Sequence, residues 1–199
     1  MFKLFQGGAE EIILASGSPR RHAYFKDLGL SFRVVPADIE ENKGPTETAV
    51  TYIERLAREK AQCVAEEYSK DWIVAADTVI CLGDAVLEKP DDECAAVEML
   101  LRLCGRKHTV RTAICLHNRA QGVSDICSVS TVVVFWDVPE TMIRAYVQSG
   151  EPMDKAGSYG IQGKGAFLVQ EIHGSYSNVV GLPLCECIGM LNRYGLLGN

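Results

Sequence analysis

The sequence lacks a membrane-length apolar segment and has no surplus of basic residues. No apolar run approaches the ~20 residues that a membrane helix requires, and residues 1–10 contain no long apolar stretch of the signal-peptide type. Its 26 acidic residues outnumber the 20 basic ones, so the formal net charge is −6. This balance argues against a binder of nucleic-acid polymers or anionic membranes. We therefore expect a cytoplasmic protein with neither partner.

The sequence also lacks the short motifs of several enzyme classes. No HExxH or GxSxG element occurs, which argues against a zinc protease and an esterase. The eight cysteines form no CxxC pair of the kind found in zinc or redox sites. Even Cys185 and Cys187 should point in different directions on a helix. We expect reduced cysteines that act as small apolar side chains.

Alternating strand-like and helix-like segments predict an α/β fold. The length suits one domain over residues 1–199, and no linker divides the chain. Residues 151–165 and 174–181 are expected to form loops. The predicted strands are 12–15, 32–35, 72–82, 86–87, 109–116, 126–136 and 166–172. The predicted helices are 19–28, a segment from 46 or 48 to 68, 90–103, 139–149 and a last one after 183.

Asp77 interrupts an apolar strand. It lies inside the segment 72–80, where an uncompensated buried carboxylate would cost several kcal/mol. One interpretation is an aspartate at a strand end that caps a neighbouring turn. The interpretation that we favour is a catalytic or metal-binding carboxylate, because perturbed charges concentrate at functional sites.

Lys60 and Glu41 are ambiguous from the pattern alone. Lys60 lies inside the apolar stripe of the predicted helix that ends at 68, where its methylenes could carry the ammonium to water or pair it with a buried anion. Glu40 and Glu41 follow a strand and precede Pro45, a position where acidic residues are commonly solvated. Both alternatives stay open until a partner is identified.

Two further segments are suited to binding an anion or a ring. Residues 16–21 place two serines, a glycine and two arginines where a strand meets a helix, which indicates a phosphate cradle, although such turns also occur on ordinary surfaces. The glycine-dense stretch 154–165 departs from a Walker site at Ser158 and Gly165. It is either a flexible loop or a backbone-lined loop in which Gln162 and Tyr159 contact a base.

Seven ordered motifs cover nearly the whole chain. They are ASGSPRR (15–21), IEE (39–41), LAREKA (56–61), AADTV (75–79), LEKP (87–90), DKAGSYGIQG (154–163) and GSYSNVVGLPL (174–184). Taken together, these motifs resemble the Maf family of nucleoside triphosphate pyrophosphatases. Within that family, the EKP and YGIQG forms are similar to the branch that acts on dTTP and UTP rather than the branch that acts on 7-methyl-GTP.

The resemblance implies a fold, an assembly and a set of site residues. The fold would be α/β, with a mixed, elongated twisted sheet flanked by helices and two lobes around a nucleotide cleft, similar to Maf and ITPase proteins. The assembly would be a homodimer. Asp77 would be the proton acceptor. The residues implied in substrate binding are Ser16, Ser18, Arg20, Arg21, Lys60, Thr78, Lys89 and Gln162, of which Arg20, Thr78 and Gln162 would shape substrate choice.

The expected reaction is hydrolysis of dTTP, UTP or related pyrimidine nucleotides to the monophosphate and pyrophosphate. Glu41 and Asp77 would hold a divalent metal cation, Mg²⁺ or Mn²⁺, and the basic residues would offset the triphosphate charge. The Gln162 amide can hydrogen-bond a uracil or thymine edge. The main alternative is a nucleotide-binding regulator of cell division or septum formation with little or no hydrolysis. A phosphatase that removes one phosphate at a time is a second alternative.

Overall fold

The computed structural model describes residues 11–198. The segment 1–10, for which no signal stretch is predicted, lies outside the described residues. None of the helices between residues 11 and 198 is long and apolar enough to cross a membrane. The strands are β1 (Ile12–Leu14), β2 (Phe32–Val34), β3 (Trp72–Leu82), β4 (Ala85–Leu87), β5 (Lys107–Asn118), β6 (Val123–Phe135) and β7 (Val169–His173). The α-helices are α1 (Pro19–Asp27), α2 (Ala49–Glu67), α3 (Glu93–Leu103), α4 (Glu140–Val147), α5 (Tyr176–Val180) and α6 (Leu184–Arg193), and the 3-10 helices are η1 (Glu151–Asp154), η2 (Ala156–Ser158) and η3 (Lys164–Leu168).

The strands form one mixed sheet, as predicted for an α/β fold. Its order is β2-β1-β3-β5-β6-β7, and β4 pairs with β3 outside this path. Strand β1 runs parallel to β2 and to β3. The β3–β4 and β6–β7 pairs are antiparallel. The mixed sheet thus confirms the predicted fold class.

The chain divides into two compact units. Of the residues that the structure describes, unit 1 contains 11–77, 113–128 and 181–198, and unit 2 contains 78–112 and 129–180. Strands β3, β5 and β6 each contribute residues to both units. The predicted single domain over 1–199 stays a prediction.

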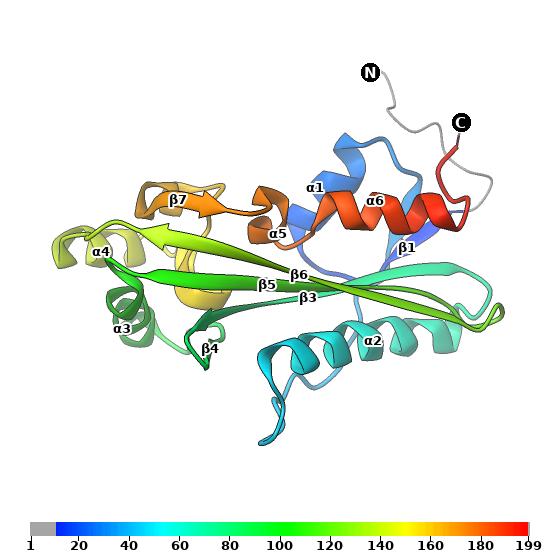
Figure 1. Cartoon of the computed structure of the whole chain (residues 1–199), viewed down its shortest axis with the longest axis horizontal. Helices are drawn as coiled ribbons and strands as arrows, with labels where there is room; N and C mark the ends of the chain where they lie inside the picture. Colours follow the sequence, from blue (N-terminus) through cyan, green and yellow to red (C-terminus); the bar gives the residue numbers. More distant parts are fainter. Residues whose placement is uncertain (1–10, 199) are drawn as a thin grey trace. The chain divides into compact units, whose positions relative to one another are not determined.

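Unit 1 has an apolar core on the face of its strands that carries α1 and α6. In this core, residues of α1 and α6 pack against alternate residues of two strands. These are Ile12 and Leu14 of β1 and Trp72 and Val74 of β3. Figure 1 shows α1 and α6 on one side of these strands and α2 on the other. Because side chains alternate along a strand, the remaining strand residues face α2.

Unit 2 is organised around an aromatic core. Phe135, Tyr146 and Tyr159 pack there with residues of α3 and α4. The rings of Phe135 and Tyr159 meet edge to face with centroids 4.8 Å apart. Helix α3 begins at Glu93 rather than at the predicted residue 90, because Asp92 accepts a hydrogen bond from the Ala95 amide and caps the helix there.

Two sequence predictions near the C-terminus were wrong. Residues 166–168, predicted as the start of a strand, complete η3, and the Phe167 carbonyl accepts a bond from the Trp136 indole at 2.6 Å. The predicted loop 174–181 contains α5, because Ser175 Oγ accepts from the Asn178 amide and begins a helical turn. In both places a side chain bonds to the backbone, the Trp136 indole in one and the Ser175 hydroxyl in the other, and composition alone does not reveal such contacts.

Candidate functional site

Strand β3 places Asp77 on its α2 face. Trp72, Val74 and Ala76 pack into the α1/α6 core of unit 1. Alternation therefore directs Ile73, Ala75 and Asp77 to the opposite face. Asp77 is only 6% exposed, as expected for a carboxylate in an apolar strand.

Helix α2 supplies the cation that compensates Asp77. The side chain of Thr48 caps the helix by accepting from the Thr51 amide at 3.2 Å. Lys60 Nζ lies 2.6 Å from Asp77 Oδ1 and 2.7 Å from Glu41 Oε1. The lysine is buried to a similar degree as Asp77, with 12% of its side chain exposed. The ion pair accounts for both residues that broke the apolar pattern, and it brings together three predicted site residues, Glu41, Lys60 and Asp77.

Helix α2 also holds the segment that carries Glu41. Tyr52 Oη donates to the Glu41 carbonyl at 2.7 Å, and Arg55 Nη2 donates to the Asn42 carbonyl at 2.8 Å. Arg55 is paired with Glu47, and this hydrogen bond lowers the pKa of Glu47 to about 2, with a smaller effect of the Gly44 amide. Glu41 itself remains half-exposed. The contacts fix the backbone at Glu41 while its carboxylate stays accessible to solvent.

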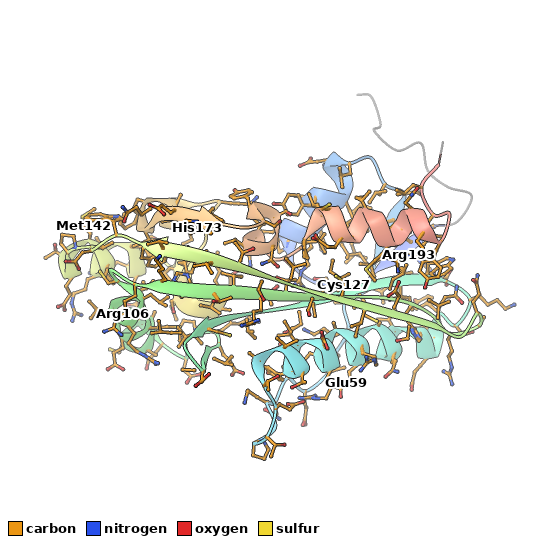
Figure 2. All side chains as sticks on the ribbon, in the orientation of Figure 1. Glu59, Arg106, Cys127, Met142, His173 and Arg193 are labelled. Carbon is orange, nitrogen blue, oxygen red and sulfur yellow. The ribbon has the colours of Figure 1, made fainter. Side chains whose placement is uncertain are left out.

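Sequence reasoning missed the roles of Tyr52 and Arg55. Tyr52 was not selected from the sequence, and the four-residue spacing of Arg55 and Glu59 indicates only an ion pair on a solvated helix face. That ion pair exists, with Arg55 Nη1 2.9 Å from Glu59 Oε2. Figure 2 shows Glu59 on the side of α2 that faces away from the strands. The second contact of Arg55, with Glu47, left no signal in the sequence, because Glu47 precedes the N-cap residue Thr48 and lies outside the helix.

The predicted phosphate cradle is built on a buried arginine. Arg21 Nε donates to the Gly181 carbonyl at 2.7 Å, and Nη1 donates to Ser16 Oγ at 3.1 Å and to the Ala76 carbonyl at 2.9 Å. Burial lowers the pKa of the Arg21 guanidinium, while Asp77 opposes this shift. Arg21 therefore ties the turn before α1 to the residue that precedes Asp77, in addition to its predicted contact with phosphate.

The other residues of this turn surround the start of α1. Ser16 Oγ accepts from the Ser18 amide at 3.3 Å, and Ser18 is the N-cap residue without a side-chain cap bond. Arg20 is less buried than Arg21. His22, which sequence reasoning did not select, has its Nε2 2.5 Å from the Ser16 carbonyl. Because that oxygen can only accept, Nε2 carries the proton.

Three predicted substrate residues, Thr78, Lys89 and Gln162, belong to unit 2. Thr78 Oγ1 lies 2.9 Å from Thr112 Oγ1, and Thr112 donates its hydroxyl proton to the Asn178 carbonyl at 3.1 Å. Thr78 is therefore the donor to Thr112. Lys89 is exposed in the segment after β4. Thr112 was not selected from the sequence, where it looks like any threonine in a strand.

The glycine-rich segment is ordered into short turns. Gln162 is exposed in the turn between η2 and η3, as a base-contacting residue would need to be. Tyr159, in contrast, is 5% exposed, and its hydroxyl lies 2.8 Å from His108 Nε2. The suggestion that Tyr159 contacts a base is therefore wrong. Ser158, with a φ of 60°, occupies the left-handed region that non-glycine residues rarely adopt.

The carboxylates of Glu41 and Asp77 suit a divalent cation. Both are hard oxygen donors, and Mg²⁺ commonly binds through one or two carboxylates, with phosphate oxygens and water completing its shell. Within residues 11–198, no cluster of three or more acidic, histidine or cysteine side chains could hold an ion. The pair fits a metal that arrives with a phosphate ligand better than one held by protein alone.

Comparison with solved structures defines the fold class. A HAM1 protein from Coxiella burnetii is 19% identical, with a TM-score of 0.56 and coverage of 92% of this chain and 99% of that chain. The Ham1 protein of Staphylococcus aureus has the same TM-score at 14% identity, over 93% of this chain and 97% of that chain. At such low identity the likeness concerns the fold alone.

The family follows from the sequence comparisons. A family model described as Maf-like protein matches residues 11–194. A dTTP/UTP pyrophosphatase of Desulfotalea psychrophila is 47% identical, over 94% of this chain and 95% of that protein. A protein of the same name from Nitratidesulfovibrio vulgaris is 46% identical, over 95% of this chain and 90% of that protein. The chain belongs to the Maf family.

Proposed function

We propose that this chain is a nucleoside triphosphate pyrophosphatase that hydrolyses dTTP and UTP to the monophosphate and pyrophosphate. The observation that carries the proposal is the buried Asp77, paired with Lys60 and Glu41, in a Maf-family chain. The names of the relatives from Desulfotalea psychrophila and Nitratidesulfovibrio vulgaris support the substrates. These names do not favour the alternative, a nucleotide-binding regulator of cell division with little or no hydrolysis.

The reaction requires a proton acceptor for the attacking water. Asp77 takes the proton as the water oxygen bonds to the α-phosphorus, and the bond from that phosphorus to the bridging oxygen breaks. The bridging oxygen leaves on pyrophosphate. Lys60, with its Nζ 2.6 Å from Asp77 Oδ1, orients the carboxylate before the transfer.

The positive groups near the phosphates have different roles. Lys60 and Arg20 offset the triphosphate charge, as does Lys89, and the Ser16 and Ser18 hydroxyls and the N-terminus of α1 add donors. Arg21 contributes charge while its bonds to Gly181 and Ala76 hold the turn. Thr78 and Gln162 set substrate choice, with the exposed Gln162 amide able to donate to and accept from a pyrimidine edge.

Glu41 and Asp77 would hold the divalent cation. When bound, a metal such as Mg²⁺ or Mn²⁺ supplies positive charge to the phosphate oxygens. Glu41, kept in place by Tyr52 and Arg55, retains a half-exposed carboxylate for this purpose. Lys60, which bonds to both carboxylates, stabilises them when no cation is present.

A phosphate-release assay tests the proposal. Purified protein is incubated with dTTP, UTP, GTP or 7-methyl-GTP, with Mg²⁺, with Mn²⁺ or with a chelator, and pyrophosphate and orthophosphate are measured separately. We expect pyrophosphate from dTTP and UTP, and only with a divalent ion. Orthophosphate as the first product would favour the stepwise phosphatase, a preference for purines would contradict the pyrimidine assignment, and nucleotide binding without release would favour the regulator.

We also propose a homodimer in the cytoplasm. The family resemblance supports the dimer, which sedimentation at micromolar concentration tests. All eight cysteines are free thiols, which agrees with a reducing compartment. Fractionation of cells that produce the full chain tests the location.

A further inference from the structure

The turn that carries Gln162 is held at both ends by two side chains. We call residues 160–165 the Gln162 turn. The Gly163 amide bonds to the Gly160 carbonyl, which closes the turn around Gln162. Tyr146 Oη accepts from the Gly160 amide at 3.1 Å, at one end of the turn. Glu151 accepts from the Lys164 amide at 2.8 Å and from the Gly165 amide at 3.0 Å, at the other end.

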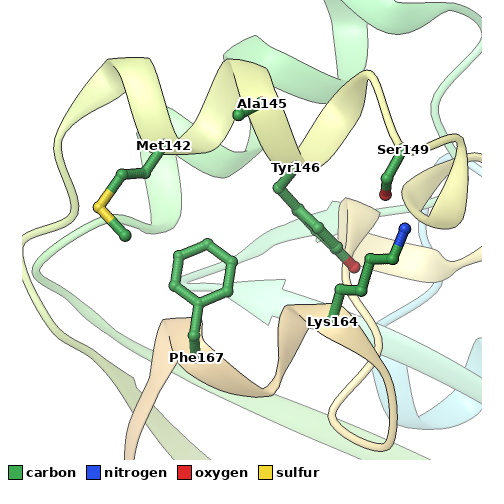
Figure 3. Close-up of a pocket in the computed structure, with 6 residues that line it drawn as sticks. All are labelled: Met142, Ala145, Tyr146, Ser149, Lys164 and Phe167. Atoms are coloured by element: carbon green, nitrogen blue, oxygen red, sulfur yellow. The ribbon is translucent and has the colours of Figure 1, made fainter.

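The two side chains are bonded to each other. Tyr146 Oη donates to Glu151 Oε1 at 3.0 Å, so one phenol joins both ends of the turn. Burial by itself would raise the pKa of Glu151, but the bonds from Gly165, Lys164 and Tyr146 together lower it below its ordinary value. Figure 3 shows Tyr146 reaching from α4 toward the segment that carries Lys164.

The glycines of the turn match this arrangement. A Cβ at Gly163 would lie 2.6 Å from both carboxylate oxygens of Glu151. A Cβ at Gly165 would lie 2.5 Å from Tyr146 Oη and 2.9 Å from the Gly160 carbonyl. The close approach of Glu151 and Tyr146 thus explains why glycine occupies these positions. The density of glycine reflects a fixed turn rather than a flexible one.

We propose that Glu151, acting with Tyr146, is a positioning residue that fixes the Gln162 turn and thereby sets the base-dependent part of nucleotide binding. The proposal rests on the proposed function, because it requires Gln162 to contact the pyrimidine. Glu151 acts through the backbone of the turn. Its carboxylate accepts two hydrogen bonds from the amides of the turn and one from the Tyr146 phenol, a set that no neutral side chain of the same length can reproduce.

The variant Glu151→Gln tests this directly. Either orientation of the glutamine amide aims an N–H₂ group at a backbone N–H, because Oε1 and Oε2 each accept from one. The matched control is Glu140→Gln, which removes an exposed carboxylate paired with Arg144 in the same unit. Pyrophosphate release is measured from dTTP and from ribose 5-triphosphate, which has no base.

We expect E151Q to raise the KM for dTTP about tenfold, with kcat within about twofold of wild type. Ribose 5-triphosphate should be hydrolysed equally by wild type, E151Q and E140Q. Equal losses on both substrates would show a merely structural role and overturn the proposal, as would a KM for dTTP that does not change.

A second variant and a second readout keep the test decisive. Gly163→Ala inserts a methyl group against Glu151 and should reproduce the E151Q pattern even if E151Q fails to fold, whereas Gly189→Ala meets nothing within 4 Å and should not. Amide exchange at Lys164 and Gly165 should accelerate in both test variants. If wild type released no pyrophosphate, the proposed function would fail, while accelerated exchange in the variants would still establish that Glu151 fixes the Gln162 turn. Unchanged exchange would show that Glu151 does not fix this turn, whatever the activity.

Discussion

Asp77 in unit 1 and His108 in unit 2 are both buried, but their partners differ in kind, an ammonium for the carboxylate and a phenol for the imidazole. In unit 1, Asp77 is 6% exposed, and Lys60 Nζ lies 2.6 Å from its Oδ1. In unit 2, His108 is 2% exposed, and burial lowers its pKa to about 4, so it is neutral in its bond to Tyr159. Glu151 stays charged by accepting backbone N–H groups rather than by facing a cation at bonding distance.

This difference indicates what each unit is built to do. A buried charge held by another side chain can exchange that partner for a metal or a phosphate, so it remains available for chemistry. A neutral histidine and a carboxylate bonded to backbone amides instead fix shape. In the proposed mechanism, unit 1 therefore supplies the proton acceptor and its paired lysine, and unit 2 supplies the ordered turn that carries Gln162.

The largest expected effect is that of Asp77→Asn in unit 1. The variant keeps the side-chain shape but removes the proton acceptor, so pyrophosphate release should fall about 10³-fold. Asp71→Asn is the control, because Asp71 forms an ion pair with Arg33 in the same unit. Initial rates with dTTP and Mg²⁺ measure both. Release at the wild-type rate by D77N would remove Asp77 from the chemistry.

Lys60→Met should cause the largest loss of stability. It leaves the buried Asp77 without its cation, so the free energy of unfolding should fall by about 4 kcal/mol. Urea unfolding of K60M, and of Lys70→Met as an exposed control, measures the effect. Asp77→Asn added to K60M should recover part of the loss. Additive losses in the double variant would contradict a direct pair.

The neutral His108 predicts a pH dependence in unit 2. In the unfolded chain His108 binds a proton with the ordinary histidine pKa of 6.5, whereas in the folded chain its pKa is about 4. Unfolding therefore takes up a proton between these values, and its free energy should fall by about 3 kcal/mol as the pH drops from 6.5 to 4. His108→Gln should flatten this slope in urea titrations, and the exposed His173→Gln should not.

The smallest expected effect is a difference in stability between variants of Arg20 and of Arg21. Arg21→Gln leaves the buried carbonyls of Ala76 and Gly181 without their donor and should lower the free energy of unfolding by about 2 kcal/mol. Arg20→Gln should change stability by less than about 0.5 kcal/mol but raise the KM for dTTP. Thermal melting and steady-state kinetics of both variants test this. Equal destabilisation by the two variants would show that Arg20 and Arg21 contribute equally to the stability of the fold.

Much of the fold could be predicted where a local rule applies. Strand β3 has the predicted bounds, and α2 begins after Thr48 and ends before Tyr68, because a capping threonine and an apolar period define both. The prediction was wrong for residues 166–168, which bond to Trp136, and for α5. The Ser175 cap of α5 is local, but Asn178 of this helix also bonds to Thr131 and Val110. Such partners lie more than thirty residues away and have no local pattern.

The charged residues of the candidate site that interrupt apolar patterns could be predicted from the sequence, but the residues that hold the site in place could not. Asp77 and Lys60 stood out because each is a charge in an apolar pattern, and the structure pairs them with each other. Tyr52, Arg55 and Glu151 did not stand out, since their surroundings in sequence suit a core residue, a solvated helix face and a loop. The catalytic and metal-binding roles assigned to Asp77 and Glu41 stay predictions.

The sequence by itself determined the class of fold, the family and the positions where a charge conflicts with its surroundings. Only the tertiary structure decided how each conflict is resolved. Asp77 meets Lys60 and Glu41, Arg21 meets two backbone carbonyls, and Glu151 meets the Gln162 turn. The physical reason is that burial makes an unpaired charge costly at a known position, whereas its partner can come from any segment that the fold brings within bonding distance.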